Sequence, residues 1–483
     1  MTNITLAWPR YAPLGLLATL ALACASSIDD NPGGTESHDP PVISDVDVVA
    51  NPNNTLSAFV RWTTDIPATS VVEFGRGAEL EYWIGDEDAL TVDHEVLVIG
   101  MQSERTYRLD PISVGEGGAE ARGESAFFQT GALPFEAFAP RLSVEASKDT
   151  QPGWTLANIV TRGILSPVFV VAFDEEGEPV WYWANEGDAG RADVDTSLVH
   201  DNATGEPRVL IGAGVAPHGP MEVDLAGDIR WEGPLQEGTE LLAAGEMHHA
   251  FEKLDNGNYL TLVYDYQGGL HDVIEEFDSD GNTVWSWSAV EHLDHSDGYL
   301  WGNAVKVDLD GDAVYYNSEH ESLLHKIRRS TGERLWTLGE GGDFVNDQRE
   351  EDAWFVGNHG VEVLANGNIL MYDNGDGDRG YSRAIEYIVD EESAEAYIAW
   401  EYPAAGSSSD VWYNGVWGDA DRLANGNTLI TAGSTLASSS PCRLFEVDVD
   451  GNKVWELWLE SDDPEQIFGA YASDRIPALA QRL

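Results

Sequence analysis

RLFEVDVDGNKVWELWL, at residues 443–459, shows the pattern that decides how this chain folds. Apolar and polar residues alternate on both sides of an acidic turn that contains Gly451. Alternation of this kind predicts two half-buried strands, and the glycine supplies the positive φ that a tight reversal needs. The tryptophans of the second strand can fill the wedge between neighbouring sheets. The segment therefore predicts a β-hairpin that packs against other hairpins.

The same unit recurs along the chain, and a second kind of hairpin lies between several of its copies. The tryptophan-rich hairpins are residues 168–183, 221–233, 273–287, 323–338, 384–402 and 443–459, and the second kind are residues 249–265, 302–318, 359–375 and 418–434. Two hairpins make a four-stranded blade, and a ring of blades is a β-propeller. The repeats predict an all-β chain with a six-bladed β-propeller over residues 142–483. Helical periodicity is almost absent there, which excludes a doubly wound α/β fold.

A smaller domain is expected before the propeller. Residues 41–134 contain short alternating strands separated by turn-rich gaps, which predicts a small antiparallel β-sandwich. The stretches VRWTTDIPATSVVEFG and HEVLVIGMQSERTYRLDPIS within it are similar to fibronectin type III-like modules of secreted bacterial enzymes. Such modules are usually spacers, so we assign this domain no catalytic role.

The N-terminus has the layout of a signal peptide. Residues 1–24 hold one cationic residue, Arg10, then an apolar run that is too short to span a membrane and a small residue before Cys24. Ala-Leu-Ala-Cys resembles a bacterial lipoprotein box with Cys24 as the lipid-bearing residue; the alternative is an ordinary signal peptide with an incidental cysteine. Residues 25–40 are polar, acidic and rich in Pro and Gly, which predicts a flexible linker. We expect an exported protein, lipid-anchored at the outer membrane and facing the periplasm or the surface.

Charge limits the partners. The chain has 85 acidic and 26 basic residues and a formal net charge of -59. Such a charge argues against nucleic acid or an anionic membrane surface as a partner, so membrane contact is expected only through the lipid anchor. We interpret it as adaptation to a saline habitat. An anionic substrate would be repelled at long range unless a local cationic pocket overrode the field. The oligomeric state is left open.

One position in the second kind of hairpin stands out. Aligned on their turns, these hairpins place His249, Gly302, His359 and Gly418 at one equivalent site where a strand begins. The innermost strand of a propeller blade runs along the central channel, so residues at its start converge on one mouth of that channel. The alignment predicts that His249 and His359 face each other there. Because two of the copies have glycine, the fold itself does not require histidine at this position.

From residue 153 to the C-terminus the sequence resembles the arylsulfotransferase family. The resemblance rests on GWTLANIV, HHAFEKLDNGN, the run from Trp301 to Gly339, and NHGVEVLANGNILMYDNGDGDRG. It implies a secreted propeller that moves a sulfuryl group from an aryl sulfate to a phenol without a nucleotide donor or a cofactor. It further implies that His359 is the nucleophile that becomes sulfated and that His249 is an acid/base or sulfate donor.

Two family motifs are altered. Where the family has His-x-Asn-Ser and Ser-Arg-His, this chain reads Trp301-Gly302-Asn303-Ala304 and Ser318-Glu319-His320. Asn303 and His320 persist and are predicted to bind substrate. A carboxylate at position 319 repels a sulfate ester unless it is protonated, paired or turned away.

A substitute cation is then required. Arg379, just after the acidic run, is predicted to bind the sulfate oxygens; Arg383 and Lys253 are further cationic candidates. The acidic runs at residues 373–378 and 308–312 lack the spacing of an EF-hand and coincide with hairpin turns, so we predict no metal site. The alternative is a weakly held structural Ca²⁺ on the alternating carboxylates of such a turn. A second hypothesis is a propeller that has lost the transferase site and acts as a binding or scaffold lipoprotein at the cell envelope.

Overall fold

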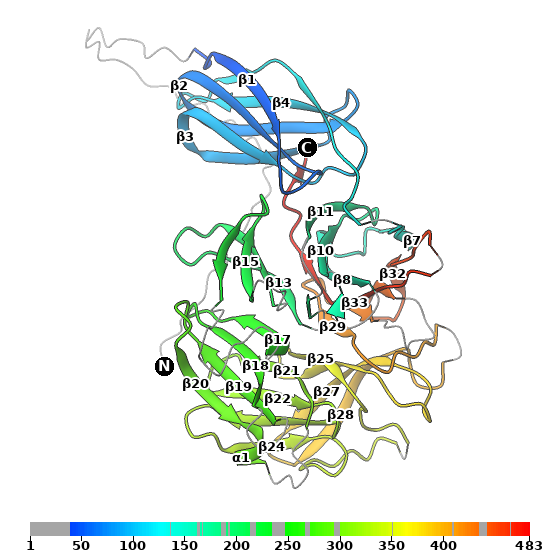
Figure 1. The fold of residues 1–483 in the computed structure, drawn as a ribbon. Coiled ribbons are helices and arrows are strands. Elements are labelled where there is room, and N and C mark those ends of the chain that lie inside the picture. The colour runs from blue at the N-terminus through cyan, green and yellow to red at the C-terminus, as the bar shows by residue number, and fades with distance from the viewer. Residues whose placement is uncertain are drawn as a thin grey trace, which may run out of the picture. The chain divides into compact units, whose positions relative to one another are not determined.

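The computed structural model of the chain is almost entirely β (Figure 1). It describes residues 39–135, 137–161, 165–166, 168–184, 190–191, 194–212, 219–233, 247–265, 271–293, 300–349, 351–407, 410–433, 442–463 and 465–483. The predicted signal peptide, Cys24 and nearly all of the linker lie outside these residues. Within them the only helix is α1 (Ala289–His292), and no helix is long and apolar enough to cross a membrane.

The N-terminal domain is one antiparallel sheet, which confirms the predicted small antiparallel β domain. Its strands are β1 (Ile43–Ala50), β2 (Ala58–Arg76), β3 (Tyr82–Val98), β4 (Thr106–Val114), β5 (Glu120–Arg122) and β6 (Ala126–Gln129), with β34 (Gln481–Arg482) paired to β3. The long strand β2 pairs with β1, β3 and β4. The register of β2 against β3 shifts twice between Thr63 and Ser70. Trp62 and Phe74 of this strand are buried in the core.

Six further sheets form the predicted six-bladed propeller. Blade one is β33 (Phe468–Ile476), β8 (Trp154–Thr161), β10 (Val168–Phe173) and β11 (Pro179–Ala184). A separate two-stranded sheet pairs β9 (Leu165–Ser166), which follows β8 in the chain, with β12 (Gly190–Arg191), which follows β11. Blade two is β13 (Thr196–His200), β14 (Pro207–Ile211), β15 (Met221–Asp224) and β16 (Ile229–Glu232). Blade three is β17 (Met247–Lys253), β18 (Tyr259–Asp265), β19 (His271–Phe277) and β20 (Thr283–Ser288).

The second half of the ring follows the same plan. Blade four is β21 (Gly302–Val307), β22 (Ala313–Ser318), β23 (Leu323–Arg328) and β24 (Arg334–Leu338). Blade five is β25 (His359–Val363), β26 (Ile369–Asp373), β27 (Arg383–Asp390) and β28 (Glu395–Tyr402). Blade six is β29 (Asp419–Arg422), β30 (Thr428–Ala432), β31 (Arg443–Val447) and β32 (Lys453–Trp458), with β7 (Arg141–Val144) at its outer edge.

The inner strands contact their neighbours around a closed ring of β13, β17, β21, β25, β29 and β33. The C-terminal strand β33 closes this ring because it pairs with β8 in blade one. The hairpins at residues 249–265, 302–318, 359–375 and 418–434 are therefore the first two strands of blades three to six, as predicted. The repeats did not reveal the inner strands of blades one and two.

The predicted tryptophan contacts between blades are present and have a regular geometry. Each outer hairpin has a register shift at the same place, so that one tryptophan follows it in every blade. These residues are Trp181, Trp231, Trp285, Trp336, Trp400 and Trp455. In five of them the indole N–H donates to the outer turn of the next blade, at Leu225, Ser279, Arg329, Glu391 and Glu175. Trp400 instead lies 4.9 Å from the Arg422 guanidinium.

The Asn-Gly-Asn turns are architectural. In blade six the Asn427 side chain donates to the buried carboxylate of Glu446 at 2.6 Å, and Asn258 does the same to Glu276 in blade three. The first asparagine of each turn accepts the backbone N–H two residues on. The repeated motif therefore satisfies a buried glutamate and needs no functional explanation.

Candidate active site at the mouth of the channel

Both predicted histidines lie at the starts of inner strands, at irregular places in the sheet. The register of β17 against β18 shifts between His248 and Phe251, and that of β25 against β26 shifts between His359 and Glu362. His249 has a φ of 58°, a conformation that residues other than glycine seldom adopt. Its carbonyl accepts the Asp195 N–H of blade two at 3.0 Å. Bulges of this type re-aim side chains and recur near active sites.

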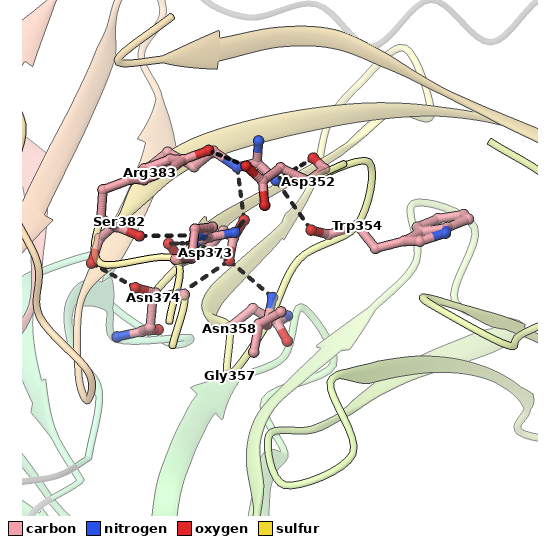
Figure 2. Close-up of polar contacts among 12 residues, drawn as sticks. Asp352, Trp354, Gly357, Asn358, Asp373, Asn374, Ser382 and Arg383 are labelled. Carbon is pink, nitrogen blue, oxygen red and sulfur yellow. Dashed lines mark hydrogen bonds and ion pairs between the residues drawn. The ribbon is translucent and has the colours of Figure 1, made fainter. Parts of the chain in front are cut away.

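His359 has a defined tautomer. Its Nδ1 lies 2.8 Å from Oδ1 of Asn374 and 3.1 Å from the Gly357 carbonyl, and the Trp417 N–H donates to its Nε2 at 3.4 Å. The Asn374 amide nitrogen donates to the carbonyls of Asn414 and Trp417 at 2.8 Å each, so the amide oxygen must face the histidine. Nδ1 therefore carries the proton and Nε2 the lone pair. Figure 2 shows the surroundings of Asn374.

A tyrosine lies between the two histidines. The ring of Tyr471 is 5.9 Å from that of His249 and 6.2 Å from that of His359, edge to face in both cases. Its hydroxyl donates to the Asn303 carbonyl at 3.0 Å. Asn158 accepts the N–H groups of Tyr471 and Ala472 and so holds a bulge of β33 in place. Tyr471 was not predicted from the sequence, because its strand lies outside the repeats.

A second histidine and an aspartate lie behind His249. Nδ1 of His248 is 2.9 Å from Nδ1 of His249, and Nε2 of His248 is 3.5 Å from Oδ1 of Asp272. The His248 ring stacks on Tyr264 with centroids 3.7 Å apart. All of these side chains are buried. The adjacent histidines were visible in the sequence, but the aspartate comes from a different strand and gave no local signal.

The glycines at the equivalent positions are required by packing. A Cβ on Gly302 would lie 2.5 Å from the Tyr316 ring and 3.0 Å from Asp272, and one on Gly418 would lie 2.5 Å from the Tyr372 ring. These contacts are shorter than real side chains make. Blades four and six therefore use this position to bring a tyrosine close to the inner strand.

The two residues predicted to bind substrate from the altered motifs differ in setting. Asn303 is buried at the cavity wall; its amide donates to the Asn358 carbonyl at 2.8 Å and accepts from Asn317 at 2.7 Å. His320 is exposed, and its backbone N–H donates to the Leu300 carbonyl at 3.4 Å. Their roles in substrate binding stay predictions.

The predicted substitute cations have internal partners. Arg379 binds both carboxylate oxygens of Asp373 at 2.7 Å. Arg383, fully buried, binds Asp373 at 2.7 Å and Glu401 at 2.8 Å; Figure 2 shows it reaching Asp373. Lys253 binds Glu222 of blade two at 2.6 Å. Any contact of Arg379 with sulfate would have to share these bonds, so its role stays a prediction.

Glu319 takes the place of the family arginine. It is partly buried, and burial raises the pKa of its carboxyl group, while nearby His320 lowers that pKa. A raised pKa is the direction that lessens the repulsion between this carboxyl group and a sulfate ester.

A cavity of about 230 Å³ occupies the channel beside Tyr471. Six carboxylates line it, namely Asp195, Glu252, Glu362, Asp419, Asp421 and Asp474, together with Lys306. Burial raises the pKa of Asp195 and Glu362 to about 7 and that of Asp419 to about 6. In the described part of the chain no three His, Cys, Asp or Glu side chains form a group that could hold a metal ion.

Fold and site together define a six-bladed β-propeller with two buried histidines, His249 and His359, on its inner strands. The chain belongs to the arylsulfotransferase (ASST) family, whose model matches residues 146–469. No curated protein matches the chain in a sequence search.

Solved structures resemble the fold at low identity. A protein of unknown function from Bacteroides caccae is 15% identical, with 64% of this chain and 94% of that one covered and a TM-score of 0.43. A putative 6-phosphogluconolactonase from Bacteroides fragilis is 11% identical, with 85% and 98% covered and a TM-score of 0.34. The Cps50 (Swd1) β-propeller domain from Myceliophteria thermophila is 12% identical, with 66% and 88% covered and a TM-score of 0.35.

Proposed function

We propose that this protein is an arylsulfate sulfotransferase that works through a sulfohistidine at His359. The observation that carries the proposal is the fixed tautomer of His359, which presents a neutral Nε2 lone pair at the mouth of the channel. A neutral imidazole nitrogen attacks sulfur, and a covalent intermediate divides one transfer into two easier steps. Family membership supplies the substrate class, an aryl sulfate donor and a phenolic acceptor.

The reaction balances with these residues. His359 Nε2 bonds to sulfur as the aryl S–O bond breaks, and His249, which starts as the imidazolium, gives a proton to the departing phenolate and becomes neutral. An acceptor phenol then gives its proton to His249 as its oxygen bonds to sulfur and the N–S bond breaks. The Trp417 N–H, which donates to the Nε2 lone pair at 3.4 Å, must release that lone pair when it bonds to sulfur and can then donate to a sulfuryl oxygen.

The test is a transfer assay with a chromogenic aryl sulfate and a phenol, followed by mass spectrometry of the His359 peptide. We expect sulfated phenol and a sulfate adduct on His359, both lost in His359→Asn. His94→Gln is the matched control, because His94 is also buried but lies in the N-terminal domain. Turnover without an adduct would contradict the sulfohistidine mechanism.

A second candidate function is a binding or scaffold propeller without transferase activity. It is favoured by one observation: Arg379 and Arg383 are both bound to Asp373, where a sulfate ligand would need an uncommitted cation. A correctly folded protein with no turnover and no adduct would support this function instead.

We also propose export and lipid anchoring at Cys24, on the basis of the lipobox-like sequence. Cys24 lies outside the described residues. Metabolic labelling with a fatty acid in a bacterial host should label the wild type and leave Cys24→Ser unlabelled. Label that persists in the variant would exclude this anchor.

A further inference from the structure

A buried chain of three side chains runs from blade three into the site. Asp272 on β19 lies 3.5 Å from Nε2 of His248, and Nδ1 of His248 lies 2.9 Å from Nδ1 of His249 on the same inner strand. His248 is wholly buried, and Asp272 and His249 are 3% and 4% exposed. The two facing Nδ1 atoms share one hydrogen bond, so only one of them is its donor.

The orientation of Asp272 is fixed from the neighbouring blade. Its Oδ2 accepts the Gly302 N–H at 2.5 Å and the Tyr316 hydroxyl at 2.6 Å, which leaves Oδ1 toward His248. The pKa of Asp272 is raised to about 6 because the effect of burial outweighs the opposite effects of these two hydrogen bonds and of nearby His271. The carboxylate is therefore mostly ionised above neutral pH. The stack on Tyr264 holds the plane of the His248 ring.

These contacts determine where the protons sit. The Asp272 carboxylate is 3.5 Å from Nε2 of His248, a charge contact rather than a hydrogen bond, and its negative charge favours a proton on that nitrogen, which puts the lone pair of a neutral His248 on Nδ1. Nδ1 of His249 must then be the donor in the bond between the two rings. The exchangeable position of His249 is thus Nε2.

We propose that Asp272 and His248 are positioning residues that hold a proton on Nδ1 of His249, so that His249 exchanges protons with phenolic oxygens only through Nε2. The catalytic role rests on the proposed transferase function, whereas the tautomer itself does not. In this cycle His249 starts as the imidazolium, with a proton on each ring nitrogen. In the first half-reaction its Nε2 proton goes to the departing phenolate while Nδ1 keeps its own, and in the second Nε2 takes the proton of the acceptor phenol.

The variant Asp272→Asn separates this role from simple packing. The amide oxygen must face the Gly302 N–H and the Tyr316 hydroxyl, so the amide N–H faces Nε2 of His248. That nitrogen then becomes an acceptor, Nδ1 of His248 becomes the donor, and His249 is left with its proton on Nε2 and its lone pair on Nδ1. Glu275→Gln is the matched control, since Glu275 is a buried carboxylate on the same strand.

The experiment is ¹⁵N NMR of the protein labelled in its histidine rings, with His248→Gln and His249→Gln spectra for assignment. We expect His249 protonated on Nδ1 in the wild type and Glu275→Gln, and on Nε2 in Asp272→Asn. In the transfer assay, Asp272→Asn should lose about 100-fold or more in kcat with KM changed less than about threefold.

A wild-type His249 that is neutral with its proton on Nε2 would overturn the proposal. An active Asp272→Asn variant with unchanged tautomers and kcat would overturn it as well. If the wild type forms no sulfohistidine, the transferase function fails, and the tautomers measured in the wild type decide this proposal alone.

Discussion

At the residue scale, the two histidines of the site have different kinds of partner. His359 faces the neutral amide of Asn374, whereas His249 is connected through His248 to the carboxylate of Asp272. A neutral partner leaves the imidazole uncharged and nucleophilic, while a carboxylate stabilises an imidazolium that forms when a proton arrives. In the proposed transfer, these two environments suit His359 to the role of nucleophile and His249 to that of acid and base.

Removing the side-chain amide of Asn374 should show whether it makes His359 the nucleophile. In Asn374→Leu, His359 loses the acceptor that fixes its tautomer, so we expect sulfohistidine to form about 10- to 100-fold more slowly in a single-turnover measurement. The carbonyls of Asn414 and Trp417 also lose their donor, which should lower the free energy of unfolding by about 1–3 kcal/mol. A variant that is destabilised but sulfated at the wild-type rate would show that Asn374 has only a structural role.

The buried charges behind His359 should matter for stability. Asp373→Asn leaves the guanidinium groups of Arg379 and Arg383 without their shared carboxylate, and we expect unfolding in denaturant to become easier by about 3–5 kcal/mol. The exposed turn residue Asp450 gives the control Asp450→Asn, expected to stay within about 0.5 kcal/mol of wild type. Equal effects of the two substitutions would contradict this account of the network.

The sequence located His249 and His359 because repeats place equivalent positions at the starts of inner strands. It did not predict Asp272, which comes from a different strand of the same blade, or Tyr471, whose strand lies at the other end of the propeller sequence. Nor did it predict that Arg379 binds Asp373. The sequence of an arginine after an acidic run does not show whether the side chain contacts a ligand or a carboxylate of that run.

At the element scale, each blade depends on one irregularity in its outer hairpin. Alternation of apolar and polar residues predicted the hairpins, and the glycine turns predicted where they reverse. The register shift that places a tryptophan toward the next blade was not predictable, because an extra residue in one strand becomes visible only when its partner is known. The closing strand β33 was missed for a related reason, since its partner β8 lies at the other end of the propeller sequence.

The tryptophan contacts between blades can be measured. Trp455→Phe removes the indole N–H that donates to the Glu175 carbonyl at 3.1 Å, and it should lower the free energy of unfolding by about 1 kcal/mol more than Trp400→Phe does. Trp400 is the matched control because it occupies the same register in blade five and stacks on Arg422 instead. Equal losses in denaturant unfolding would mean that ring packing alone joins the blades.

At the scale of the whole molecule, charge opposes the proposed donor. The chain has a net charge of -59, and six carboxylates line the cavity beside Tyr471. Long-range repulsion of an anion is screened by salt. We expect kcat/KM for an aryl sulfate to rise about two- to tenfold between low salt and about 0.5 M salt, with little change in the KM of a neutral phenol. A fall with salt would indicate that a local cation dominates the approach of the donor.

The cavity carboxylates should also give stability a defined pH dependence. Their pKa values are raised in the folded state, to about 7 for Asp195 and Glu362 and about 6 for Asp419. Raised pKa values mean that the folded state binds protons more tightly, so these groups stabilise it at low pH and lose that contribution as pH rises from about 4 to about 7. Asp419→Asn should therefore raise the free energy of unfolding relative to wild type more at pH 8 than at pH 5, with a difference of about 1 kcal/mol between the two pH values. The measurement is thermal unfolding of both proteins at each pH. An equal effect at both pH values would contradict the raised pKa.

The proposed function depends on one event, the covalent sulfation of His359. Its most direct test is mass spectrometry of the intact protein and of the His359 peptide, after brief mixing with an aryl sulfate and no acceptor. We predict one added sulfuryl group, located on His359, absent from His359→Asn and discharged when a phenol is added. A folded protein that releases phenolate while His359 stays unmodified would contradict the account.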